Sequence, residues 1–226
     1  MKLTYLGHAC FMVTVNGKHL LFDPFVRPNP LASEIDIDKI EADYILISHG
    51  HADHIADAAE IARRTGATII AAFEITNWLQ QQGIEKVHGM NIGGKWRFDF
   101  GTVKCVVAQH SSVLPDGTYG GNPMGFVISG GEKNFYYSGD TALTLDMQLI
   151  PQFAVPDFCI LPIGDNFTMG IEDATRAAHM INCSTVVGVH YNTFPPIQID
   201  TVKAKENFAK TGLTLLLPSI GESIEL

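Results

Sequence analysis

The stretch SHGHADH, residues 48–54, places three histidines and one aspartate within six consecutive positions. It directly follows the apolar run DYILI, residues 43–47, which predicts a short strand that is buried on both faces. Side chains that follow the carboxyl end of such a strand point into the crevice where open α/β sheets bind ligands. The stretch therefore predicts a ligand site at the end of a strand.

The residue types in this stretch are those that bind transition metals. In an extended segment His49 and His51 project to the same side, whereas Asp53 and His54 come from the turn that opens a helix. One short loop then offers a histidine pair and an Asp–His pair, whose nitrogen and oxygen atoms suit Zn²⁺, Mn²⁺ or Fe²⁺. The alternative is a polar, histidine-rich loop in which Asp53 caps the helix.

Three later segments repeat the arrangement of an apolar strand that ends in a metal-ligand residue. VVAQH ends at His110, FYYSGD ends at Asp140, and VVGVH ends at His190. Chance would rarely place such a residue at each of these strand ends, so the pattern favours a metal site over the polar loop.

The order of the predicted elements indicates the fold class. Predicted strands cover residues 2–6, 10–15, 19–23, 43–48, 67–72, 84–90, 95–100, 102–109, 124–130, 134–139, 157–163, 184–190 and 213–217. Predicted helices cover residues 55–66, 73–83, 144–150, 171–182 and 201–212. The elements run as β-hairpins, αβ units, β-hairpins and αβ units, which suggests two similar halves. Packing two mixed sheets face to face with helices outside gives a four-layer αββα sandwich, an α/β fold, as one domain over residues 1–226.

Composition narrows the functional classes. The chain has 226 residues and a net charge of −9, with no block of basic residues, so broad nucleic-acid binding is not expected. It shows neither a signal-peptide pattern nor a run of ~18 apolar residues that could cross a membrane. Its four cysteines lie far apart without a CxxC motif, which predicts reduced thiols in a cytoplasmic protein.

The ligand pattern resembles the metallo-β-lactamase superfamily, whose signature is HxHxDH followed by a His, an Asp and a last His. HGHADH, His110, Asp140 and His190 match it in that order. The resemblance covers essentially the whole chain and extends to TYLGHACF, LLFDPF, IGDNFTMG and HYNTFP. The chain looks like the stand-alone metal-dependent hydrolases of bacteria and archaea, a branch related to the ascorbate-6-phosphate lactonases.

The resemblance implies two divalent metal ions, with zinc favoured and manganese or iron as alternatives. One ion would be held by His49, His51 and His110, the other by Asp53, His54 and His190, and Asp140 would bridge them. Asp53 would also orient the attacking water.

Further residues are candidates for supporting roles. His8, which follows the first strand, would protonate the leaving group or grip the substrate, unless it is only a structural hydrogen-bonding residue. Asp23 ends a buried strand before a proline and would support a ligand histidine, or simply hold a turn. Thr168 and Asn192 are candidates for substrate contact; they would otherwise cap a helix and hold a turn.

The favoured function is hydrolysis of an ester-type bond in a small molecule by metal-activated water, with a lactone or a phosphorylated cyclic ester as substrate. The alternatives are a phosphodiesterase for a small nucleotide or lipid head group, and a non-catalytic metal-binding module. A di-iron redox enzyme is disfavoured, because His51 stands where that branch of the superfamily typically carries a glutamate. A homo-oligomer is compatible with a chain of this type.

Overall fold

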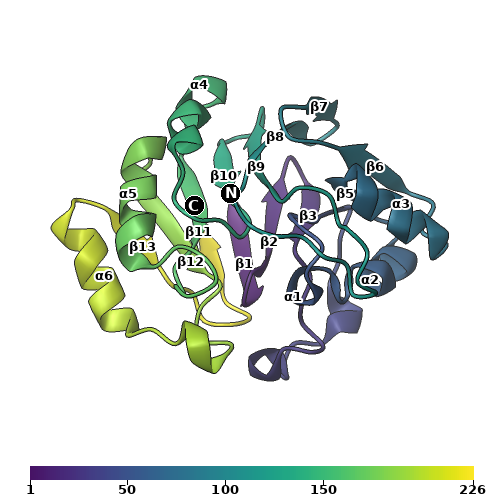
Figure 1. The fold of residues 1–226 in the computed structure, drawn as a ribbon, viewed down its shortest axis with the longest axis horizontal. Coiled ribbons are helices and arrows are strands. Elements are labelled where there is room, and N and C mark those ends of the chain that lie inside the picture. Colours follow the sequence, from purple (N-terminus) through teal and green to yellow (C-terminus); the bar gives the residue numbers. More distant parts are fainter.

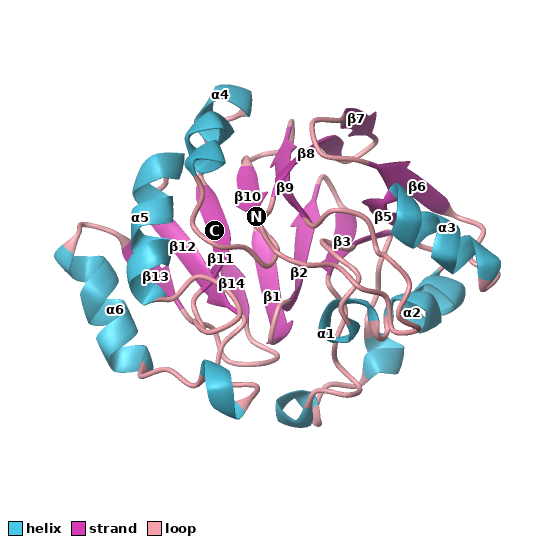
Figure 2. Ribbon diagram, in the orientation of Figure 1, coloured by secondary structure: helices cyan, strands magenta, loops and turns pink.

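Two seven-stranded β-sheets pack against each other in the computed structural model, which describes residues 1–226. Helices cover the outer faces of both sheets, so the order of layers is helix, sheet, sheet, helix (Figures 1 and 2). The predicted αββα sandwich is therefore confirmed.

The first sheet has the order β14-β1-β2-β3-β4-β5-β6. Its strands are β1 (Lys2–Gly7), β2 (Cys10–Val15), β3 (Lys18–Phe22), β4 (Tyr44–Leu46), β5 (Thr68–Ala72), β6 (Val87–Met90) and β14 (Ser223–Glu225). The helices in this half are α1 (Ala52–Ile55), α2 (Ala58–Thr65) and α3 (Phe73–Gln81), with 3₁₀ helices at Pro30–Ala32 and Ile37–Lys39.

The second sheet has the order β13-β12-β11-β10-β9-β8-β7. Its strands are β7 (Lys95–Phe98), β8 (Gly101–Val107), β9 (Met124–Ser129), β10 (Phe135–Tyr137), β11 (Phe158–Pro162), β12 (Thr185–Val189) and β13 (Thr214–Leu216). The helices in this half are α4 (Ile150–Phe153), α5 (Ile171–Ile181) and α6 (Thr201–Lys210), with 3₁₀ helices at Leu145–Leu149 and Pro195–Ile197.

The two halves share one topology. In each sheet the early strands pair antiparallel, from β1 to β3 and from β7 to β10. The later strands pair parallel, from β3 to β6 and from β10 to β13. Because parallel neighbours need crossover connections, the helices collect on the outer faces and leave the inner faces free to pack together.

The helix expected over residues 144–150 is a 3₁₀ helix at Leu145–Leu149 that is continued by α4. Two features of the first half also differ from the sequence-based expectation. The helix expected over residues 55–66 is interrupted between α1 and α2, and Asp57 lies at the interruption. Its carboxylate accepts hydrogen bonds from the backbone N–H groups of Val26 and Arg27, at 2.6 and 3.0 Å, which ties the break to the loop after β3. The second feature is β14, which was not predicted and pairs antiparallel with β1, so the C-terminus completes the first sheet.

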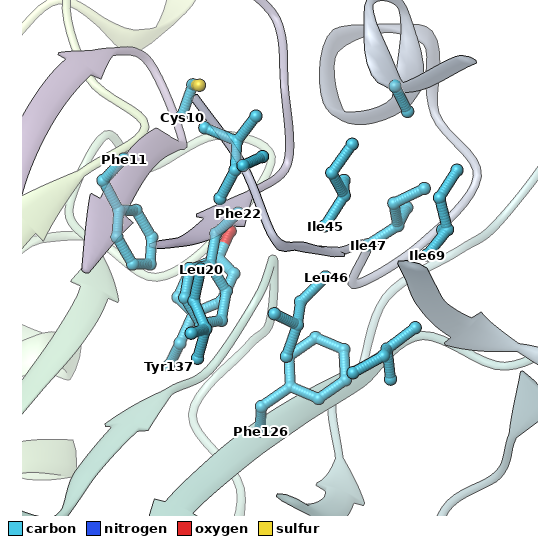
Figure 3. Close-up of a cluster of buried hydrophobic side chains, with 14 of the residues drawn as sticks. Cys10, Phe11, Leu20, Phe22, Ile45, Leu46, Ile47, Ile69, Phe126 and Tyr137 are labelled. Atoms are coloured by element: carbon cyan, nitrogen blue, oxygen red, sulfur yellow. The ribbon is translucent and has the colours of Figure 1, made fainter. Parts of the chain in front are cut away.

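The core between the sheets contains aromatic side chains packed among aliphatic ones (Figure 3). The rings of Phe11 and Phe22 from the first sheet stack at 4.6 Å, and Tyr137 from the second sheet meets both edge-on. All three side chains are fully buried. Packing of this kind fixes the position of the Tyr137 hydroxyl, which reaches the polar network described below.

None of the helices combines the length and hydropathy needed to span a bilayer. All four cysteines are buried free thiols.

Candidate metal centre

The candidate ligands gather at one edge of the sandwich because each follows the carboxyl end of a strand. The strands β1, β3, β4, β8, β10 and β12 are followed respectively by His8, Asp23, His49, His110, Asp140 and His190. Three of these residues, His8, Asp23 and His190, have positive φ angles of 57°, 40° and 56°. Such backbone strain in residues other than glycine clusters at functional sites, because the surrounding structure must hold it in place.

One group of ligand atoms comes from His49, His51 and His110, which lie within 4.8 Å of one another. His49 Nε2 is 2.9 Å from His51 Nδ1, and the His110 ring centroid is 5.0 Å from the centroids of both other rings. Ser111 Oγ lies 3.3 Å from Nε2 of His51, on the other side of that ring. The three imidazoles thus present nitrogens to a common point.

A second group comes from His8, Asp53, His54 and His190, again within 4.8 Å. Asp53 Oδ2 lies 3.8 Å from Nε2 of both His54 and His190. His54 is fully buried, and its Nε2 has no hydrogen-bond partner. A buried imidazole nitrogen rarely stays unpartnered, and one that faces two carboxylates fits a metal-coordinating position.

Asp140 lies between the two groups and is almost completely buried. Its Oδ2 is 3.0 Å from His190 Nε2 and 3.3 Å from His54 Nε2, in the second group. The same oxygen is 3.7 Å from His110 Nε2 and 4.0 Å from His49 Nε2, in the first group. One carboxylate oxygen is therefore within reach of both clusters, and all seven ligand residues expected from the sequence come together.

Asp23 lies beneath the centre and is fully buried. Its Oδ2 is 2.8 Å from His54 Nδ1 and accepts hydrogen bonds from the hydroxyls of Ser48 and Tyr137, both at 2.6 Å. Its Oδ1 accepts from the Ser48 backbone N–H at 2.7 Å. Ser48 Oγ is also 3.0 Å from His49 Nδ1. Protonation of both Nδ1 atoms toward these acceptors would leave the Nε2 lone pairs of His54 and His49 available to a metal ion.

His8 is buried and has a neighbour at each ring nitrogen. Nε2 lies 3.0 Å from Asp53 Oδ2, and Nδ1 lies 2.9 Å from the Thr193 hydroxyl. Burial lowers the pKa of His8 to about 4, against the opposing effect of its hydrogen bond to Asp53. His8 is therefore neutral at pH 7 and donates Nε2–H to the carboxylate while Nδ1 accepts from Thr193.

The carboxylates set the electrostatics of the second group. Burial alone would lower the pKa of His190, but the charge and hydrogen bond of Asp140 outweigh it and raise this pKa to about 9. Burial alone would raise the pKa of Asp53 and Asp140, yet the surrounding histidines hold both well below the usual range. Both carboxylates are therefore ionised at neutral pH and available as ligands.

A cavity of about 280 Å³ opens over the centre. It is lined by His51, Asp53, His110, Ser111, Asp140, Phe167, His190 and Phe194. The sequence did not single out Ser111, Phe167 or Phe194. The only signal in the sequence was their place next to recognised motifs. Ser111 follows the candidate ligand His110, and the two phenylalanines lie in the segments IGDNFTMG and HYNTFP.

Thr168 and Asn192 are not among the residues that line this cavity. The Thr168 hydroxyl lies 3.3 Å from its neighbour's carbonyl oxygen, on Met169. Asn192 Oδ1 accepts a hydrogen bond from the Ile199 N–H at 2.7 Å, and its own backbone has a positive φ of 61°. The Asn192 contacts hold the turn after β12. Phe167, next to Thr168, and Phe194, two residues after Asn192, line the cavity instead.

The fold and the site together define an αββα protein with a candidate metal centre to which both halves contribute residues. The family described as "Beta-lactamase superfamily domain" matches residues 2–190. A "UPF0173 metal-dependent hydrolase" of Flavobacterium johnsoniae is 51% identical, and one of Methylacidiphilum infernorum is 50% identical, each over the full length of both chains. This chain belongs to the metallo-β-lactamase superfamily.

Solved structures agree with this assignment. Igni18, described as a metallo hydrolase from Ignicoccus hospitalis, superposes with a TM-score of 0.88 at 38% identity, over 99% of this chain and 97% of that one. An isothiocyanate hydrolase from Delia radicum gut bacteria superposes with a TM-score of 0.80 at 23% identity, over 100% of this chain and 99% of that one. The second likeness shows a shared fold.

Proposed function

We propose that this protein is a hydrolase that uses two divalent metal ions to cleave an ester-type bond in a small molecule. His49, His51 and His110 would hold one ion, and Asp53, His54 and His190 the other. The observation that carries the proposal is the position of Asp140 Oδ2, 3.0–4.0 Å from histidine nitrogens of both groups. Zinc is the favoured metal, with manganese or iron as alternatives, because imidazole and carboxylate ligands suit all three.

When bound, two such ions supply a hydroxide-like nucleophile from water near neutral pH and stabilise negative charge on the reacting oxygen. Asp53 is the residue of this chain best placed to orient the water. Its side chain is 27% exposed, so it faces the cavity while His8 holds Oδ2 from behind. Because its pKa lies well below the usual range, Asp53 accepts a hydrogen bond rather than a proton.

We propose that His8 acts through Asp53. Both of its ring nitrogens are engaged, and its side chain has no exposed surface. In the neutral form it supports the ionised carboxylate, with Thr193 fixing its tautomer. The leaving group would then take its proton from water in the cavity. Thr168 and Asn192 stay predictions of substrate contact, for a substrate that extends beyond the cavity.

A lactone or a phosphorylated cyclic ester is the favoured substrate class. The proposal places the enzyme in the cytoplasm, a reducing compartment that suits four free cysteines. Assembly as a homo-oligomer remains an expectation, and no nucleic-acid or membrane partner is proposed.

The test combines metal content with hydrolysis. Protein reconstituted separately with Zn²⁺ and Mn²⁺ is assayed with a chromogenic carboxylic ester, a lactone and bis(4-nitrophenyl) phosphate, and metal per chain is measured by mass spectrometry. We expect about two ions per chain and turnover of the carboxylic ester or lactone. Asp140→Ala should lose at least about 100-fold in kcat/KM and at least one ion, because it removes the ligand shared by both groups.

The control is Asp146→Ala, an exposed aspartate outside the centre, which should match the wild type in both measurements. Turnover confined to the phosphate diester would replace the proposal by the phosphodiesterase alternative. About two bound ions with no turnover of any of the three would favour the non-catalytic metal-binding module. A wild-type rate retained in Asp140→Ala would contradict the assignment of the site.

A further inference from the structure

We infer that the substrate of this centre is small and uncharged and carries an apolar or aromatic group next to the bond that is cleaved; this inference rests on the proposed function. The cavity of about 280 Å³ is slightly below the ~300–1,000 Å³ of typical small-molecule sites. The ions themselves would occupy part of it. A nucleotide, or a lipid head group with its glycerol, would extend beyond it.

Apart from Ser111, two phenylalanines form the part of the wall that the ligand residues do not supply. Phe167 is 54% exposed. It lies in the loop between β11 and α5, which is tied to the centre because the Met169 N–H donates to the carbonyl of Thr141, the neighbour of Asp140. A large apolar side chain that stays exposed at the mouth of a cavity is a candidate for ligand contact.

Phe194 approaches from the loop after β12. Its ring meets the His8 ring edge-on at 5.3 Å and lies 6.3 Å from the Phe25 ring. These contacts hold Phe194 in place against the second group of ligands, so it offers a preorganised aromatic surface beside the reacting centre. An apolar or aromatic substrate group gains contact area there without ordering a mobile side chain.

The wall contains no lysine and no arginine. A phosphate or carboxylate away from the reacting bond would normally be bound by such a cation, and would otherwise lose hydration without compensation. Lys203 and Lys210 line a separate groove of about 810 Å³ between α5 and α6, and this groove includes none of the candidate metal ligands. Of the two favoured substrates, the lactone therefore fits this wall, and the phosphorylated cyclic ester does not.

Binding of hydroxamates tests the inference without requiring turnover, because a hydroxamate chelates bound metal directly. We would measure calorimetrically the affinity of the Zn²⁺-loaded protein for acetohydroxamate, benzohydroxamate and 3-carboxybenzohydroxamate. Benzohydroxamate should bind at least about 10-fold more tightly than its carboxylate analogue. Phe167→Ala and Phe194→Ala should each weaken the binding of benzohydroxamate by about 3- to 10-fold. The affinity for acetohydroxamate should change by less than about 2-fold.

Phe153→Ala is the matched control, because Phe153 is also a half-exposed phenylalanine but lines another cavity. It should leave all three affinities unchanged. Equal or tighter binding of the carboxylate analogue, or no effect of either cavity variant, would overturn the inference.

Hydrolysis separates the inference from the proposed function. The neutral ester 4-nitrophenyl butyrate and the nearly isosteric anion 4-nitrophenyl hemisuccinate share one leaving group. If both are turned over and the anion is preferred, the hydrolase stands and the inference fails. If neither is turned over while the hydroxamate preference holds, the inference about the wall stands and the proposed ester hydrolysis fails.

Discussion

At the scale of single residues, Asp23 organises the centre without facing the cavity. It contacts His54 directly and His49 through Ser48, and it accepts a further hydrogen bond from Tyr137. One buried carboxylate thereby fixes ligand histidines in both groups. Its position at the end of a strand could be read from the sequence, but its partners could not, because Tyr137 lies 114 residues away along the chain.

Asp23→Asn should weaken metal binding by about 10- to 100-fold, because an amide presents N–H donors where the neighbouring groups need an acceptor. Affinity is measured by competition with a chromophoric chelator. Tyr137→Phe is the control at the same carboxylate: it removes one hydrogen bond and no link to a ligand, so affinity should change by less than about 3-fold. Unchanged affinity in Asp23→Asn would refute the supporting role.

At the scale of elements, the turn after β10 depends on a glycine. Gly139 has φ of 61° and precedes Asp140, the proposed shared ligand. A Cβ at this position would lie 2.7 Å from the Ser48 Cβ and 3.1 Å from the Met124 carbonyl oxygen. The end of β10 therefore packs directly against the end of β4, and this close approach brings ligands from the two sheets together.

Gly139→Ala should lower the free energy of unfolding by roughly 2–5 kcal/mol, through left-handed strain plus the steric overlap, and should release at least one ion. Chemical denaturation and metal analysis check the two effects. Gly93→Ala is the matched control, since Gly93 has φ of 87° with nothing within 4 Å of the added Cβ. This variant should lower the free energy of unfolding only by the ~1–2 kcal/mol of backbone strain, and it should keep both ions. Equal losses in the two variants would mean that the close approach is unimportant.

At the scale of the whole molecule, the centre joins the two halves. His49, His51, Asp53 and His54 follow a strand of the first sheet, whereas His110, Asp140 and His190 follow strands of the second. Without metal, the ion pair of His190 with Asp140 makes stability depend on pH. The pKa of His190 is about 9 in the folded chain against an ordinary 6.5, so its contribution is complete below about pH 6.5 and is lost as pH rises through 9.

His8 acts in the opposite direction. Its pKa of about 4 lies below the ordinary value, so its contribution is present above about pH 6.5 and is lost as pH falls through 4. We expect the Tm of chelated protein to be highest near pH 6–7 and to fall on both sides. In Zn²⁺-loaded protein the alkaline decline should be much smaller, because the ion replaces the proton on His190.

Thermal melts between pH 5 and 9, with chelator or with Zn²⁺, test this expectation. Asp140→Asn is the control for the chelated form: without the negative charge the pKa of His190 falls and the alkaline decline should shrink. Parallel pH profiles for the loaded and chelated protein would contradict a metal site that includes His190.

Much of the architecture was predictable because short-range sequence patterns specify most of the helices and strands. Apolar alternation and turn residues located thirteen of the fourteen strands. The helix predicted to end at residue 66 does end there, at Gly66, which adopts a left-handed φ of 73° after α2. The strand β14 was missed because its three residues are only defined by pairing with β1 at the other end of the chain. The interruption at Asp57 was missed for the same reason, since its hydrogen-bond partners lie in the loop after β3.

The sequence by itself determined the order of the elements and the choice of candidate ligand residues, because strand and helix periodicity and the spacing of HGHADH depend only on neighbouring positions. Tertiary structure alone decided what surrounds those ligands. It paired His8 with Asp53 and Thr193, set Asp23 beneath two histidines, and turned Phe167 and Phe194 rather than Thr168 and Asn192 toward the cavity. These contacts join residues far apart in the chain, and their geometry follows from how the two sheets pack.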